Sequence, residues 1–106
     1  MRDNFIKVVQ AAARKRILFL PHALSQMNSP ERMISADEVR RVLLKGEIVE
    51  GYPDDVRGHS CLMLGFGREG RAVHVVCAPK DEYLAIISAY IPSLSRWQPD
   101  FKTRRR

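Results

Sequence analysis

The stretch RAVHVVCA, residues 71–78, decides the fold. Its small and β-branched apolar residues lie between REG at 68–70 and PKDE at 79–82, a pattern typical of a buried strand between two turns. Similar runs stand on either side, SCLMLGFG at 60–67 and YLAIISAYI at 83–91. Together they predict an antiparallel meander. A histidine, His74, stands in the middle of the central run, and its role is the main question that the sequence raises.

The first half of the chain has helical periodicity instead. In NFIKVVQAAARKR, residues 4–16, apolar residues recur at helical spacing and predict an amphipathic helix. Pro21 suits the first turn of a second, short helix. A third helix should start with a capping box between Ser35 and Glu38, and Gly46 should end it in a left-handed conformation.

These patterns predict an α+β fold in which N-terminal helices pack on one face of a C-terminal antiparallel meander of about four strands. A chain of 106 residues fits one domain. We expect its helical part at about residues 3–46, its sheet at about 47–92, and a basic tail at 98–106 whose last residues are unanchored.

Side chains alternate across a strand, so each run divides into two faces. One face is wholly apolar and should be the one that the helices cover; it contains Leu62, Leu64, Phe66, Val73, Val75, Cys77, Ala85, Ile87, Ala89 and Ile91. The opposite face carries the groups that can exchange protons, namely His74, Ser88 and Tyr90.

Keeping the apolar set together fixes a register. A two-residue turn at Glu69-Gly70 would put Phe66 opposite Val73. On the next strand, Val75 would then stand opposite Ile87, His74 opposite Ser88, and Ala72 opposite Tyr90. Two readings of His74 remain open: a neutral, hydrogen-bonded core residue, or a member of a functional cluster with Ser88 and Tyr90.

The composition favours an anionic partner. The formal net charge is +6 and arginine dominates the 18 basic residues; the planar guanidinium suits phosphate. Arg57, Arg71 and Arg96 are the candidates for nucleic-acid contacts. Cys61 and Cys77 have no metal-binding spacing, so we expect neither a disulfide nor a metal site. No apolar run is long enough for a membrane span, which favours a cytoplasmic protein.

The strings GEIVEGYPDD, GRAVHVVCA and IISAYIPSLSRWQPDF, in this order, resemble a bacterial family known as domain of unknown function 4258, over roughly residues 20–106. The family pattern is matched by His22 at the start of a short helix, by Arg32 and Ile34, by His74 in a central strand, and by Ser88, Tyr90 and Pro92 in the last strand. Gln26 departs from it, because an arginine is expected there.

The resemblance implies a distant similarity to small toxin ribonucleases of the RelE and BrnT kind, which pack helices on an antiparallel sheet in a barnase-like arrangement. RNA can be cut without a metal when its 2′-hydroxyl attacks the neighbouring phosphate. The candidate catalytic residues are His22, Arg32, His74, Ser88 and Tyr90, without a cofactor; which of them is acid and which is base stays open.

Two hypotheses therefore stand. The first is a toxin-like, metal-independent ribonuclease or an RNA-binding relative of one. The alternative is a non-catalytic module that binds a cognate antitoxin-like protein or a second copy of itself through the apolar sheet face that carries His74. A DNA-binding regulator is weaker, since the helix after Ser35 alternates acids and bases on its exposed side.

Overall fold

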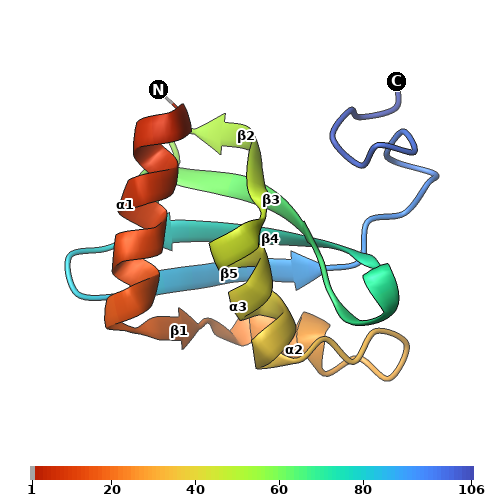
Figure 1. Cartoon of the computed structure of the whole chain (residues 1–106), viewed down its shortest axis with the longest axis horizontal. Coiled ribbons are helices and arrows are strands. Elements are labelled where there is room, and N and C mark those ends of the chain that lie inside the picture. Colours follow the sequence, from red (N-terminus) through yellow and green to blue (C-terminus); the bar gives the residue numbers. More distant parts are fainter. Residues whose placement is uncertain (1) are drawn as a thin grey trace.

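The computed structural model describes residues 2–106 and shows an α+β fold, as predicted (Figure 1). Three helices and five strands follow one another in the order α1 (Arg2–Lys15), β1 (Ile17–Phe19), α2 (Pro21–Met27), α3 (Ala36–Lys45), β2 (Glu47–Tyr52), β3 (Ser60–Phe66), β4 (Ala72–Pro79) and β5 (Leu84–Tyr90). All three helices precede the meander of β2 to β5 in the chain, and β1 lies between α1 and α2.

The predicted capping box of α3 is confirmed. The Ser35 hydroxyl accepts a hydrogen bond from the Glu38 backbone N–H, and the Glu38 carboxylate accepts one from the Ser35 N–H. The left-handed stop at Gly46 is wrong, because its φ is −84°. Glycine is needed there for space instead: a Cβ would lie 2.4 Å from the Leu64 carbonyl oxygen and 2.5 Å from that of Val42.

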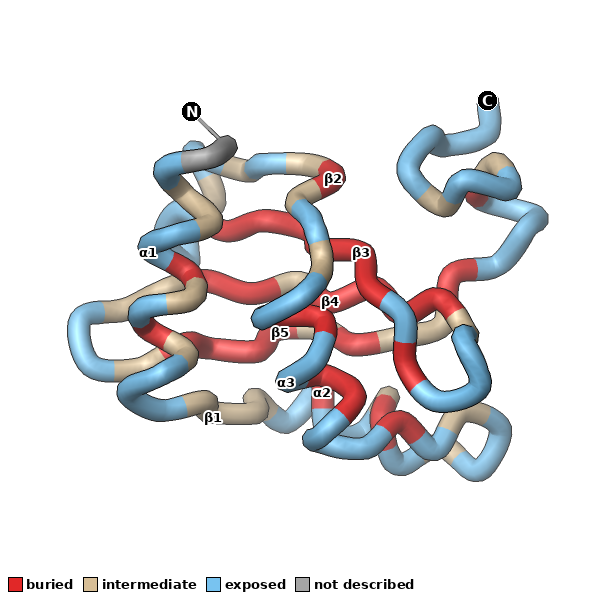
Figure 2. The backbone as a smooth tube through the Cα atoms, in the orientation of Figure 1, coloured by how far each residue is buried: buried red, intermediate tan, exposed pale blue. Residues whose placement is uncertain are grey.

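The sheet has five strands in the order β1-β5-β4-β3-β2, one more than the sequence predicted. The additional strand is β1, which pairs with β5 in parallel at the edge of the sheet. All other pairs are antiparallel. Figure 1 shows α1 and α3 lying across the same face of this sheet. Figure 2 shows the central strands as the buried part of the molecule, with the exposed residues on loops and outer helical surfaces.

The face prediction for β3 is wrong. Cys61 and Met63, not Leu62 and Leu64, join Val75 under the helices. The reason is the connection from β3 to β4: a 3₁₀ turn (Arg68–Gly70) with the Gly67 N–H donating to the Arg71 carbonyl makes Phe66 face Ala72 rather than Val73. A shift of one residue turns every side chain of a strand to the other face.

The register between β4 and β5 is displaced by two residues, which preserves the side on which His74 lies. His74 stands opposite Tyr90, and Ser88 stands opposite Val76. A β-bulge, in which Ile87 is the extra residue of β5, produces part of the shift. Consequently Leu84 and Ile86 pack under the helices in place of Ala85 and Ile87, whereas the prediction for Ala89 holds.

The face of the sheet opposite the helices is covered by the C-terminal arm, which we define as residues 92–106. Trp97 is 3% exposed and packs in one cluster with Leu62, Leu64, Val49 and Ala72, with Phe101 beside it. Burial of an indole side chain stabilises the docked arm by about 4 kcal/mol. The basic tail is also not unanchored as expected, since Arg105 bonds to the backbone of the Leu94–Trp97 segment.

Candidate functional site: an arginine pocket backed by a buried histidine

His74 is completely buried, and the C-terminal arm rather than the helices covers it. Its Nε2 lies 2.8 Å from the Phe101 carbonyl oxygen, and its Nδ1 lies 3.2 Å from the Tyr90 hydroxyl. The indole of Trp97 packs edge-on against the imidazole, with ring centroids 4.6 Å apart. The histidine is therefore both a satisfied core residue and the neighbour of Tyr90.

These two contacts define the tautomer of His74. A carbonyl oxygen can only accept, so Nε2 carries the proton and donates to Phe101. Nδ1 is then the acceptor, and the Tyr90 hydroxyl donates to it. Burial lowers the pKa of His74, which keeps the ring neutral, and burial also raises the pKa of the Tyr90 hydroxyl. The unprotonated Nδ1 is a base held in place by its partner carbonyl.

Tyr90, which is hydrogen-bonded to the buried His74, also lines a pocket of about 520 Å³. We call it the arginine pocket, and its lining includes Gln26, Arg32, Tyr90, Arg96, Trp97 and Arg104. Among the described side chains, Arg32 and Arg96 have no hydrogen-bond or ion-pair partner for their guanidinium groups. Two unpaired guanidiniums on one hollow form a site suited to an anion.

The third arginine of the pocket, Arg104, is paired. Its guanidinium donates to both carboxylate oxygens of Glu50 at 2.8 and 2.9 Å. Glu50 also accepts from the Tyr52 hydroxyl at 2.5 Å, and the hydrogen bond from Arg104 is the main reason that the pKa of Glu50 is lowered. The pocket thus contains three guanidiniums, of which one is neutralised, and carries two net positive charges.

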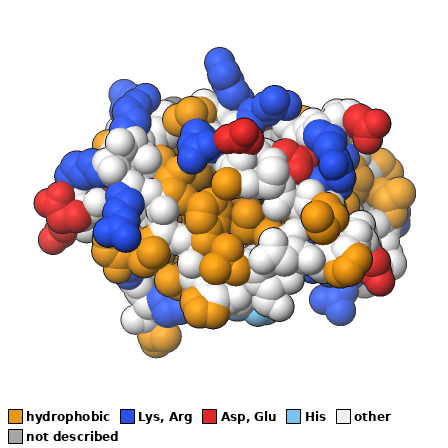
Figure 3. All heavy atoms as spheres, turned by 90° about the horizontal axis from the view of Figure 1, so that it is seen from below, with side chains coloured by type: hydrophobic (Ala, Val, Ile, Leu, Met, Phe, Trp, Pro, Cys, Tyr) orange, Lys and Arg blue, Asp and Glu red, His pale blue; other side chains and the backbone are white. Residues whose placement is uncertain are grey.

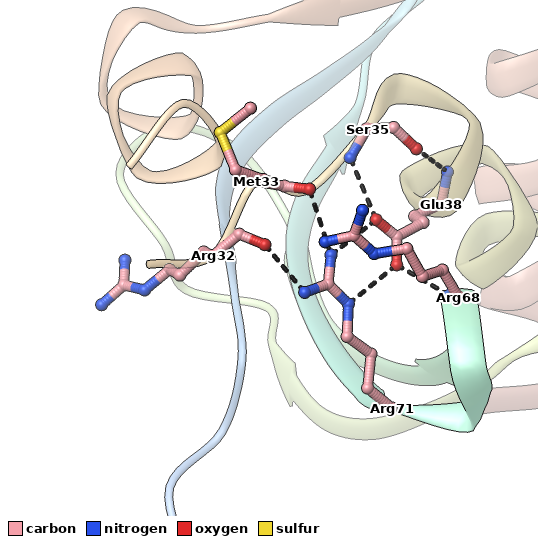
Figure 4. Close-up of polar contacts among 6 residues, drawn as sticks. All are labelled: Arg32, Met33, Ser35, Glu38, Arg68 and Arg71. Carbon is pink, nitrogen blue, oxygen red and sulfur yellow. Dashed lines mark hydrogen bonds and ion pairs between the residues drawn. The ribbon is translucent and has the colours of Figure 1, made fainter. Parts of the chain in front are cut away.

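Arg71 lies outside this pocket, in a cluster that we call the clamp: Ser35, Glu38 and Arg71 (Figure 4). Arg71 donates to both Glu38 oxygens at 2.7 and 3.0 Å, and to the carbonyl oxygens of Arg32 and Met33 at 2.7 and 3.1 Å. The hydrogen bonds from Arg71 are the largest cause that lowers the pKa of the Glu38 carboxyl to about 2, and the backbone N–H groups of Arg68 and Ser35 also donate to it. Four of the five guanidinium N–H groups are used in this structural role.

The clamp also determines where Arg32 points. Figure 4 shows the Arg32 carbonyl directed at Arg71 and the Arg32 side chain extending away from the clamp. Gly67 makes room for the arrangement, because a Cβ there would lie 2.2 Å from Glu38 Oε2. The clamp therefore fixes the backbone from which Arg32 reaches the arginine pocket.

The structure brings together only some of the residues proposed from the sequence. Arg32, Tyr90 and Arg96 line the pocket, and His74 lies directly behind Tyr90. His22 is exposed in α2 and Ser88 is half-buried on β5; neither lines the pocket.

Arg57 lies in the loop between β2 and β3 and is paired with Asp55. Gln26, where an arginine was expected, accepts a hydrogen bond from the Ala89 N–H at 2.9 Å. This hydrogen bond satisfies the N–H of a β5 residue that lies beyond the segment of β5 paired with β1.

Sequence reasoning missed Arg104 and Glu50. Arg104 was read as part of a solvated basic tail, and the only signal that could have placed it is Trp97, whose burial draws the arm onto the sheet. Arg104 lies over the Trp97 ring, with its guanidinium carbon 4.6 Å from the ring centroid.

Fold and site together define a small α+β domain with an arginine-lined pocket next to the end of its β5 strand. Residues 19–91, more than half of the chain, match the family described as domain of unknown function DUF4258, and the chain belongs to that family. A search of curated proteins and of solved structures finds no significant match. The family match ends at residue 91, so the arm that supplies Arg96, Trp97 and Arg104 lies beyond it.

No helix within residues 2–106 has the length and apolar character to cross a membrane. No group of three or more histidine, cysteine, aspartate or glutamate side chains is placed there so as to hold a metal ion.

Proposed function

We propose that this protein binds RNA through the arginine pocket and is a toxin-like, metal-independent ribonuclease whose acid–base pair is Tyr90 and His74. One observation carries the proposal: the unpaired guanidiniums of Arg32 and Arg96 share a pocket with a tyrosine that is hydrogen-bonded to a buried base. A cytoplasmic location, where RNA is encountered, is part of the proposal.

The chemistry needs only groups that the pocket contains. Arg32 and Arg96 hold the phosphate, and their positive charge stabilises the charge that grows on it. The 2′-hydroxyl gives its proton to the Tyr90 oxygen while Tyr90 passes its own to His74 Nδ1. The O2′–P bond forms and the P–O5′ bond breaks, which leaves a 2′,3′-cyclic phosphate and a 5′ oxygen. His74 returns the proton through Tyr90 to that oxygen, so the pair ends unchanged.

His74 acts as a weak base in this step. Burial keeps the ring unprotonated at neutral pH, as a base must be, but its lowered pKa also reduces its affinity for a proton. We therefore expect slow turnover, and binding and cleavage have to be measured separately.

The test uses a labelled RNA in EDTA with wild type, Tyr90→Phe and His74→Gln. We expect cyclic-phosphate products from wild type, and a cleavage rate at least about 100-fold lower for Tyr90→Phe with binding retained, since general acid–base catalysis contributes about that much or more. RNA bound by wild type but never cleaved would remove the enzyme and leave the RNA-binding protein. Absence of binding at low salt would overturn both.

A second candidate function, a protein-interaction module, is favoured by another surface. A hollow of about 490 Å³ is lined mainly by apolar residues, including Phe19, Leu24, Met27 and Met33, and Leu24 and Met33 are 42% and 55% exposed. Figure 3 shows hydrophobic side chains gathered in the middle of the face seen from the side of β1 and α2. A second copy or an antitoxin-like protein would dock there, and size-exclusion chromatography over a range of concentrations tests the first of these.

A further inference from the structure

We propose that Arg104 is a stacking platform for a nucleobase, so that the arginine pocket takes single-stranded RNA. The inference deepens the proposed function and rests on it. It assigns the three arginines of the pocket two different tasks: Arg32 and Arg96 bind phosphate, and Arg104 binds a base.

The first observation is that the Arg104 guanidinium has partners on its edge and over the Trp97 ring. Its edge is occupied, because two of its nitrogens donate to the two oxygens of Glu50. One further side is occupied by Trp97, because the guanidinium carbon lies over the indole ring, 4.6 Å from its centroid. With its edge and one side fixed, the group has little freedom left to turn toward a phosphate.

The second observation is that the other side of the guanidinium is open. The side chain of Arg104 remains 59% exposed and lines the arginine pocket, whereas Trp97 beneath it is buried. Planar guanidinium groups are among the surfaces on which unpaired RNA bases stack. A base placed there would lie on the side of the guanidinium away from Trp97.

The charge of the pocket agrees with this division. Glu50 neutralises Arg104 and leaves two positive charges on Arg32 and Arg96, and a neutral planar ligand is better suited than a second phosphate to a guanidinium already paired with a carboxylate. A volume of about 520 Å³ has room for a nucleotide. In duplex RNA the bases are stacked and paired, so only a single strand can place one on Arg104.

The experiment compares Arg104→Lys with wild type. Lysine keeps the charge and can still reach Glu50, but it has no plane on which a base can stack. Binding is measured for a short single-stranded RNA, for the same strand with one abasic position, and for its duplex. Arg106→Lys, an exchange two residues away at an exposed position, is the matched control.

We expect wild type to bind the intact single strand about tenfold more tightly than the strand with the abasic position at the platform, the order of magnitude of one base–aromatic stack. Arg104→Lys should lose that tenfold preference and bind the abasic strand as wild type does, while Arg106→Lys should keep it. On wild type alone, 2-aminopurine at the same position should be quenched on binding, which tests the stack without any variant.

Equal binding of intact and abasic strands by wild type, or an unquenched 2-aminopurine at every position, would overturn the platform while leaving phosphate binding in place. Preference for duplex over single strand would overturn it as well. Failure of wild type to bind any of the three RNAs would be the distinct result that removes the proposed function and this inference together.

Discussion

Arg71 and Arg32 are joined by a hydrogen bond, yet they use their guanidinium groups in opposite ways. Arg71 makes four hydrogen bonds to Glu38 and to two backbone carbonyls, whereas Arg32 has no partner among the described side chains and lines a pocket. Sequence gives both the same charge. Arg32 and Arg96, whose guanidinium donors have no partner among the described side chains, are therefore the arginines that we propose as phosphate ligands.

Breaking the clamp should have the largest effect, a loss in the free energy of unfolding. Glu38→Gln leaves Arg71, which is 23% exposed, without its anionic partner, and loss of one member of a buried ion pair costs about 3 kcal/mol of unfolding free energy. Urea unfolding at pH 7 measures this. Asp37→Asn is the control, because Asp37 is 90% exposed and pairs only with Arg40 at the surface; a loss as small as that of the control would show that the clamp is not structural.

The Glu38–Arg71 ion pair also predicts that the free energy of unfolding depends on pH. The Glu38 pKa is lowered from 4.5 to about 2, so the folded state binds this proton less readily than the unfolded chain. The contribution, about 3 kcal/mol from the size of the shift, is present in full above pH 4.5 and is lost as the pH falls toward 2.

Unfolding of wild type and Glu38→Gln should therefore be compared between pH 7 and pH 2. The difference between the two proteins is expected to narrow steadily below pH 4.5. A difference that stays constant over this range would mean that the Glu38 carboxylate is not the source of the stability.

Much of the fold could be predicted from sequence because its signals are local. The helical period of residues 4–16, Pro21 and the Ser35–Glu38 capping box each act within a few residues, and all three were confirmed. The strand registers could not be predicted, because they depend on how a loop closes. The 3₁₀ turn after Gly67 accompanies a register shift of one residue between β3 and β4, and the bulge at Ile87 accounts for part of the two-residue shift between β4 and β5. Only the shift of two left His74 on the predicted face.

The candidate site was predictable only to the extent that its residues lie on the sheet. His74 and Tyr90 lie on neighbouring strands, and the alternation of side chains along each strand places both on the same face of the sheet. Their proximity could therefore be predicted. Arg96 and Arg104 reach the pocket only because Trp97 is buried against Leu62 and Leu64, a contact between segments more than thirty residues apart in sequence. Whether an arginine is paired or free depends on such long-range contacts, and composition does not contain them.

Removing an unpaired guanidinium should affect RNA binding and leave stability nearly unchanged, the reverse of the effect expected for the clamp. Arg32→Gln and Arg96→Gln should each weaken RNA binding by about tenfold and reduce the slope of log affinity against log salt concentration by about 0.7, the value for one phosphate contact on a single strand. Unfolding free energy should change by no more than about 0.5 kcal/mol, because neither guanidinium has a partner to lose. Fluorescence anisotropy at several salt concentrations provides the slope, and an unchanged slope for both variants would exclude them as phosphate ligands.

The smallest effect should come from Arg57→Gln. Arg57 was a candidate for nucleic-acid contact, but it is exposed in the β2–β3 loop and its guanidinium already donates twice to Asp55. A charge that is paired and lies outside the pocket acts on bound RNA only through solvent, where ions screen it within about 10 Å. We therefore expect RNA affinity to fall by about twofold or less, in the same anisotropy assay as Arg32→Gln. If Arg57→Gln weakened binding as much as Arg32→Gln does, RNA would have to contact the β2–β3 loop as well, and the distinction between paired and unpaired arginines would lose its value for locating the binding surface.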